Sequence, residues 1–203
     1  MSNTAPADLA RVFVAIELPP PVIAALETVQ DALAASQLPL RLTGAAGIHL
    51  TLAFLGEIPV ARVAVVNAAV VASAAAVAPF DLRAEGIGMF PNARVPRVIW
   101  AGVEGTAEAM ASLTAVRERI AAQLAAAGFT IDRRFDPHLT LARVRDGATG
   151  AERAAIGAAV QALPRPAPAP FAVTQISVMR SVLQRGGAVY SALAQVPLRA
   201  DSA

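Results

Sequence analysis

The chain of 203 residues contains no cysteine and no lysine, and it has only two histidines, one tryptophan and one tyrosine. The lack of cysteine excludes disulfides, thiolate catalysis and cysteine metal sites. Arginine supplies every basic side chain and the formal net charge is only +2, so long-range attraction to nucleic acid should be weak. Any site for an anion must therefore be local.

Long apolar runs are also missing. The most membrane-like segment, 63–78, is interrupted by Asn67 and Ser73 and followed by Pro79. It falls short of the roughly 18 to 20 apolar residues that a membrane span needs, so we expect a buried helix there and no membrane partner. Residues 1–10 lack a basic segment followed by an apolar core, so we expect no secretory signal. The protein is expected to be cytoplasmic and monomeric.

The two histidines belong to a pentapeptide that occurs twice. HLTLA begins at His49 and again at His138. Alternation of polar and apolar residues is typical of a half-buried β-strand, in which the histidine and the threonine share one face and the leucines share the other. Four side chains are therefore predicted to bracket a single small site: His49, Thr51, His138 and Thr140.

Hydrophobic periodicity, together with proline and glycine, predicts the elements along the chain. The predicted strands are 11–18, 48–55, 80–89, 97–104, 137–143, 171–180 and 188–196. The predicted helices are 22–36, 60–78, 106–127 and 150–163. Gly128 is expected to end the third helix, and the last two strands are expected to form a hairpin around Gly186 and Gly187.

The order of these elements repeats. The segment at 11–17 (RVFVAIE) resembles that at 97–104 (RVIWAGVE), and each is followed by a helix, a histidine strand and another helix. Shared motifs in a shared order predict an internal duplication. We expect one domain over 1–203, with repeats at approximately 11–89 and 97–197. Duplication explains why one chain presents two equivalent histidine strands.

Two histidines in one site suit acid–base chemistry. Imidazole titrates near pH 6.5, so one ring can accept a proton at neutral pH while the other donates one. Phosphodiester displacement needs such a base and such an acid on opposite sides of phosphorus. The hydroxyls of Thr51 and Thr140 can donate hydrogen bonds to the non-bridging phosphate oxygens. The residues alone do not decide which histidine is the acid.

The paired His-x-Thr-x motifs resemble those of the two-histidine phosphoesterase superfamily. HLTLAFLGE at 49–57, RVIWAGVE at 97–104 and PHLTLAR at 137–143 are similar to its bacterial RNA 2′,3′-cyclic phosphodiesterase branch, also called 2′-5′ RNA ligase. The resemblance extends over about residues 11–198. It implies an α+β fold of two lobes, in which two antiparallel sheets flanked by helices surround a central cleft.

The resemblance also implies an activity. Terminal 2′,3′-cyclic phosphate, on RNA ends or nucleotides, is opened to a 2′-phosphate without a metal, and the family also joins RNA ends reversibly through 2′-5′ linkages. By resemblance, His49 donates a proton to the departing 3′ oxygen and His138 accepts a proton from water. Arg143 matches an arginine that helps to hold the substrate in the family. Strand alternation instead places Arg143 opposite to His138, as a surface residue, and both interpretations stay open here.

Other residues near the motifs have two interpretations each. Phe54 stands in the position equivalent to Arg143 and is expected in the core. Asp136 can orient His138 or simply begin an Asp-Pro turn. Trp100 can stack on a base or belong to the core. Two more arginines can line the cleft, Arg94 and Arg97.

Three other functions are compatible with the sequence. The site can act on another cyclic nucleotide, or it can hold a nucleotide or an RNA end without turnover. The third is a metal site on the two histidines, but catalytic zinc usually takes three protein ligands, and the chain has no other histidine and no cysteine. We therefore expect no metal and no other cofactor. A turnover assay separates an enzyme from a binding protein.

Overall fold

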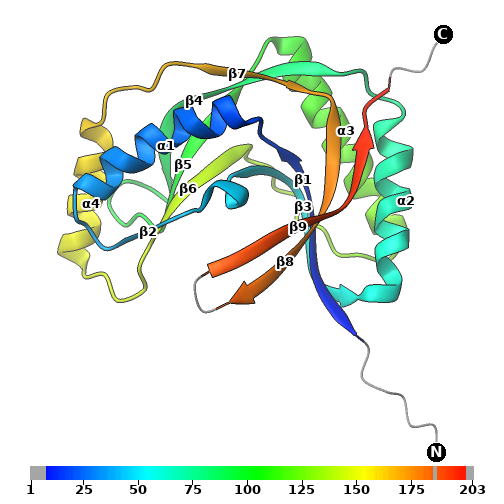
Figure 1. Cartoon of the computed structure of the whole chain (residues 1–203), viewed down its shortest axis with the longest axis horizontal. Coiled ribbons are helices and arrows are strands. Elements are labelled where there is room, and N and C mark those ends of the chain that lie inside the picture. Colours follow the sequence, from blue (N-terminus) through cyan, green and yellow to red (C-terminus); the bar gives the residue numbers. More distant parts are fainter. Residues whose placement is uncertain (1–7, 185–186, 200–203) are drawn as a thin grey trace, which may run out of the picture.

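The computed structural model describes residues 8–184 and 187–199 (Figure 1). The strands in this part are β1 (Leu9–Glu17), β2 (Leu40–Leu42), β3 (His49–Pro59), β4 (Phe80–Phe90), β5 (Val98–Glu104), β6 (His138–Val144), β7 (Ala169–Val173), β8 (Gln175–Gln184) and β9 (Gly187–Pro197). The α-helices are α1 (Pro20–Ala35), α2 (Val63–Ala74), α3 (Ala107–Ala126) and α4 (Gly150–Ala162). Two 3₁₀ turns complete the set, η1 (Ala45–Gly47) and η2 (Val60–Arg62). The α+β class predicted from the sequence is confirmed.

The described strands belong to one antiparallel sheet in the order β7-β4-β5-β6-β3-β1-β8-β9, with β2 paired to β6. The resemblance implied two antiparallel sheets, whereas the described strands are hydrogen-bonded into one sheet. The two histidine strands, β3 and β6, join the halves at the centre through the pair Leu50 and Leu139. The junction is narrow because no other register pair links β3 to β6 in the described part of the chain. The two lobes and the duplication stay predictions.

The sheet is curled, and the clearest evidence is that one predicted strand is divided into two strands of the structure. The expected strand 171–180 is two strands, β7 and β8, separated only by Thr174. β7 pairs with β4 at one edge of the sheet, whereas β8 pairs with β1 near the other. Since one residue cannot span an open sheet, curvature must bring these two regions together, as Figure 1 shows.

The helices cover the outside of the curled sheet. Helices α2 and α3 lie side by side, while α1 contacts β6 and β7 and α4 contacts β4 (Figure 1). Helix α3 begins where the Thr106 hydroxyl accepts a hydrogen bond from the Ala109 N–H, which satisfies one of the free donors of the first turn. It ends before Gly128, whose φ of 81° permits the predicted stop.

The packed side of the sheet forms one continuous apolar core, and the leucines of both histidine strands lie within it. No helix in the described residues is long and apolar enough to cross a membrane. The 1–10 segment, for which we expected no secretory signal, is described only from residue 8 onward. The β8–β9 hairpin is present, but Gly186 in its predicted turn lies outside the described residues.

Candidate active site

The two histidine strands place their histidines on either side of the central junction of the sheet. Leu50 and Leu139 pair across β3 and β6 and are completely buried. The residues that flank these leucines therefore point to the opposite face, where they are half-buried. That face opens into a cavity of about 680 Å³ whose lining includes all four predicted side chains. We call this the two-histidine cavity: it is bounded by His49, Thr51, His138 and Thr140.

Arg143 lines the same cavity, although simple strand alternation places it on the other face. Pairing between β5 and β6 leaves Leu141 as an extra residue, which makes a β-bulge. The bulge reverses the alternation, so that Leu141 and Ala142 are both buried and Arg143 is exposed. Arg143 thus returns to the face of His138. The geometry agrees with the substrate contact that the resemblance implies.

Phe54 is also on this face, and its predicted core position is wrong. The ladder between β1 and β3 skips Leu52 in the same way, so Leu52 and Ala53 are both buried and Phe54 is 50% exposed. The two motifs therefore carry equivalent bulges. They bring Arg143 from one motif and Phe54 from the other into the lining of the two-histidine cavity.

His138 is oriented by a backbone group. Its Nδ1 lies 2.7 Å from the carbonyl oxygen of Asp136, and because a carbonyl only accepts, we assign the proton to Nδ1. A neutral ring in this tautomer has an unprotonated Nε2 that can accept a proton. The carboxylate of Asp136 instead accepts a hydrogen bond from Arg134 Nε at 2.7 Å. Asp136 thus orients His138 through its backbone and not through its side chain.

His49 has a much more apolar environment. Its ring stacks on Phe13 with centroids 4.7 Å apart and meets the edge of Tyr190 at 5.4 Å. Burial lowers the pKa of His49 to about 4, although the Ala46 carbonyl and the Glu17 carboxylate favour the charged ring. The Ala46 carbonyl is near, yet no described group makes a regular hydrogen bond to Nδ1. The ring is therefore neutral at pH 7 when the cavity holds no anion.

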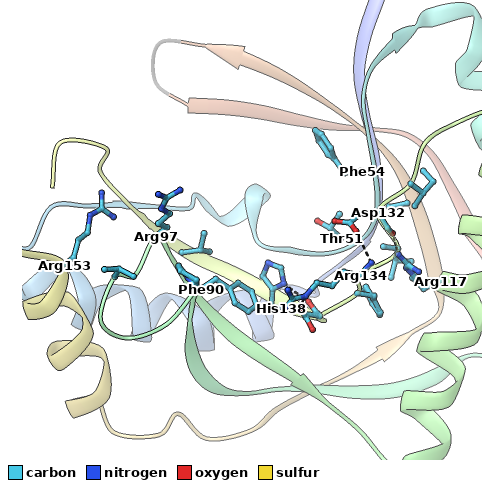
Figure 2. Close-up of a pocket in the computed structure, with 17 residues that line it drawn as sticks. Thr51, Phe54, Phe90, Arg97, Arg117, Asp132, Arg134, His138 and Arg153 are labelled. Carbon is cyan, nitrogen blue, oxygen red and sulfur yellow. Dashed lines mark hydrogen bonds and ion pairs between the residues drawn. The ribbon is translucent and has the colours of Figure 1, made fainter. Parts of the chain in front are cut away.

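A second, larger cavity of about 1020 Å³ adjoins the first and shares Thr51, Phe54 and His138 with it. Figure 2 shows His138 in the middle of this lining, with Arg97 and Arg153 on one side and Arg134 on the other. The larger cavity contains one histidine and the smaller contains both. The acid–base chemistry expected from the sequence needs both histidines, and of these two cavities only the smaller is lined by both. The larger one can hold a neighbouring part of a substrate.

Of the remaining residues that the sequence suggested for the cleft, only one lines either of these two cavities. Arg97 lines the larger cavity, whereas Arg94 and Trp100 line neither of the two. Trp100 packs against Phe90 at a centroid distance of 5.1 Å and covers Gly88, where even a Cβ would overlap its ring. Trp100 is half-buried, pairs with Thr140 on the histidine face of the sheet and is not among the core residues of the described chain. The core interpretation of Trp100 is therefore not supported, and stacking on a base stays a prediction. Among the described residues, no group of three or more histidine, cysteine, aspartate or glutamate side chains could hold a metal ion.

Three lining residues could not be found from the sequence. Arg11 and Tyr190 lie on strands of ordinary pattern, and Arg41 lies on β2, a strand of three residues that we expected to be a loop. Tertiary pairing alone brings them to the cavity. The described lining of the two-histidine cavity contains three arginines and no carboxylate. Positive charge is therefore concentrated here in a chain whose net charge is only +2.

Similarity to known proteins agrees with this geometry. An RNA 2′,3′-cyclic phosphodiesterase of Geobacillus stearothermophilus is 34% identical over 151 residues, which cover 74% of this chain but 45% of that protein's own length. A protein of the same name from Thermus thermophilus is 33% identical over 76% of this chain and 73% of its own. A third protein of this name, from Methanothermobacter thermautotrophicus, is 25% identical over 89% of this chain and 95% of its own length.

Solved structures share the whole fold. A protein from Thermus thermophilus superposes with a TM-score of 0.72 and 30% identity, covering 94% of this chain and 99% of that one. Escherichia coli LigT complexed with 3′-AMP superposes with a TM-score of 0.71 and 26% identity over the same shares. The sequence profile of the 2′-5′ RNA ligase superfamily matches residues 18–185. The chain therefore belongs to the 2′-5′ RNA ligase superfamily.

Proposed function

We propose that this chain is an RNA 2′,3′-cyclic phosphodiesterase, which hydrolyses terminal 2′,3′-cyclic phosphate on RNA ends or nucleotides to a 2′-phosphate. One observation carries the proposal: two histidines, each with a threonine two residues further on, line one cavity that has arginines and no carboxylate in its described lining. The names of the relatives support the same substrate class. The E. coli relative has been crystallised with 3′-AMP, which supports a nucleotide as the ligand.

In the proposed reaction, water attacks phosphorus in line with the bond to the 3′ oxygen. Nε2 of His138 takes a proton from the water as the new P–O bond forms. His49 gives a proton to the 3′ oxygen as its bond to phosphorus breaks. One water is consumed, and the products are a 2′-phosphate and a free 3′-hydroxyl. Proton exchange with solvent then restores both rings.

The base role of His138 is supported by its hydrogen bond to the Asp136 carbonyl, which leaves Nε2 free to accept. The acid role of His49 needs a protonated ring, and burial disfavours that form in the free protein. A phosphate anion in the cavity favours it, in the same direction as Glu17 does. In this proposal, binding of the anionic substrate therefore favours protonation of His49, which is the acid that the reaction needs.

Thr51 and Thr140 are proposed to donate hydrogen bonds to the non-bridging oxygens, and Arg143 to hold the substrate through its guanidinium. If the 5′-hydroxyl of a second RNA replaces water, the same bond breaks and a 2′-5′ linkage forms. Reversible 2′-5′ RNA ligase activity is therefore part of the proposal. The duplicated single domain, the monomeric state and the cytoplasmic location stay predictions from the sequence.

The proposed function is tested by measuring turnover and binding of the same RNA. The purified protein is incubated with an oligoribonucleotide that ends in 2′,3′-cyclic phosphate, and loss of the cyclic end is followed together with the affinity for the same RNA. We expect turnover by the wild type and none above background by the double variant His49→Ala/His138→Ala. Binding without turnover would identify a binding protein instead. A higher kcat/KM on 3′,5′-cyclic AMP would move the substrate class to another cyclic nucleotide.

A further inference from the structure

Two arginines stand directly opposite each other in the wall of the two-histidine cavity. Arg41 of β2 pairs with Arg143 of β6 in the antiparallel ladder, and both side chains are exposed and line the cavity. Like charges at directly opposite positions destabilise a sheet. The ion pairs found among the described residues involve only Arg83 and Arg134. No carboxylate of the described residues therefore compensates this repulsion.

The pair lies beside the reacting groups and not among them. Arg143 is three residues beyond Thr140 on β6, with the Leu141 bulge between them, so it lies further along the strand by somewhat less than the roughly 10 Å that three residues of a regular strand span. A ligand group held between the two guanidinium groups is therefore displaced from the phosphorus that lies between the histidines. Each guanidinium offers a planar fork of donors that matches a phosphate. An anion between them would relieve their repulsion as well as accept their hydrogen bonds.

We propose that Arg41 and Arg143 together bind the internal phosphodiester that links the terminal nucleotide of the RNA to the preceding one. This inference rests on the proposed function, because it assumes that the terminal cyclic phosphate lies between the histidines. It gives Arg41 a role in specificity: the protein favours RNA ends over free nucleoside 2′,3′-cyclic phosphates, which lack this linkage. Arg41 does not contact the reacting phosphate.

Three substrates separate the internal phosphate from the rest of the RNA. These are adenosine 2′,3′-cyclic phosphate, the dinucleotide ApA ending in 2′,3′-cyclic phosphate, and the same dinucleotide with an uncharged methylphosphonate as its internal linkage. For the wild type, kcat/KM should be about tenfold or more higher on the charged dinucleotide than on the methylphosphonate, as expected for hydrogen bonds to a charged group. In Arg41→Gln this ratio should fall several-fold, because Arg143 alone remains to hold the internal phosphate.

The matched control is Arg119→Gln, which removes the same charge from an exposed position on helix α3 that lines neither cavity. It should keep the wild-type ratio. An equal rate of the wild type on both dinucleotides would overturn the inference, even if Arg41→Gln failed to fold. The inference would also be overturned if Arg41→Gln kept the wild-type ratio of kcat/KM between the two dinucleotides. The same holds if Arg41→Gln lowered kcat/KM on adenosine 2′,3′-cyclic phosphate as much as on the charged dinucleotide.

A failure of the proposed function looks different, because none of the three substrates would then be turned over. Affinity still decides the inference in that case. The dinucleotide ApA with a 2′-phosphate end should bind the wild type about tenfold more tightly than its methylphosphonate analogue. In Arg41→Gln this difference in affinity should shrink several-fold, because Arg143 alone remains to bind the charged linkage. Equal affinities in the wild type would contradict the phosphate site whatever the catalytic result.

Discussion

The Nδ1 of His138 lies 2.7 Å from the carbonyl oxygen of Asp136, two residues earlier in the chain. This contact fixes a ring tautomer that can accept a proton at Nε2. The Ala46 carbonyl near His49 favours the charged ring but makes no regular hydrogen bond to its Nδ1. The His49 ring is buried against Phe13 and Tyr190. Two identical motifs therefore place chemically different imidazoles in one cavity, and this difference supports one base and one acid.

Each histidine should be indispensable for turnover. We expect His49→Ala and His138→Ala each to lower kcat by about 100- to 10,000-fold, since one proton transfer then loses its catalyst. Circular dichroism and thermal unfolding should show a folded protein in both cases, because neither ring lies in the apolar core. A folded variant with a rate near that of the wild type would contradict the paired mechanism.

The pKa of His49 should rise when an anion binds. Burial holds it at about 4 in the free protein, and a negative charge beside the ring favours the protonated form. Imidazole resonances followed by NMR should therefore titrate at higher pH in saturating 3′-AMP than in its absence. By linkage, the affinity for 3′-AMP should strengthen as the pH falls through the pKa of the complex toward the value of about 4 in the free protein. The assignment of His49 as the acid fails if the ring stays neutral at pH 6 in the complex.

The same burial makes folding stability depend on pH. The pKa of His49 is about 4 in the folded chain, against the ordinary 6.5, so the unfolded chain binds more protons between these values. The free energy of unfolding should fall as the pH drops from 6.5 toward 4, by up to about 3 kcal/mol from this residue. Urea unfolding across this range measures the effect. His49→Gln should have a shallower slope, and an unchanged slope would show that His49 is readily protonated in the fold.

Chelators should leave the activity intact. The chain has two histidines and no cysteine, and the proposed mechanism assigns both proton transfers to imidazoles. Rates measured before and after incubation with excess EDTA should agree. A loss of activity that zinc or manganese restores would require a metal in the reaction.

The sequence predicted the histidine face and the core face correctly because HLTL alternates strictly. Alternation then failed at Phe54 and Arg143, where a bulge in each strand reverses the side on which residues emerge. Bulges depend on the register with neighbouring strands, and no local pattern in either motif signals them. The separation of β7 from β8 at Thr174 was missed for a related reason, since it depends on the curl of the whole sheet.

Arg41 shows the same limit at the site itself. It lies in a segment with proline and glycine nearby, which predicts a loop, and its importance comes only from its pairing with Arg143 across β2 and β6. Residues of a repeated motif can be identified from the sequence. Residues that tertiary pairing brings beside that motif need the structure.

The most direct test of the central claim is the identity of the product end. If His138 activates water while His49 protonates the opposite oxygen, only the bond to the 3′ oxygen breaks. An oligoribonucleotide with a labelled 2′,3′-cyclic phosphate should therefore give a single product, a 2′-phosphate with a free 3′-hydroxyl, in an analysis that resolves the two phosphate positions. Mainly 3′-phosphate would contradict the assignment of acid and base, and an unchanged cyclic end would contradict the proposed activity.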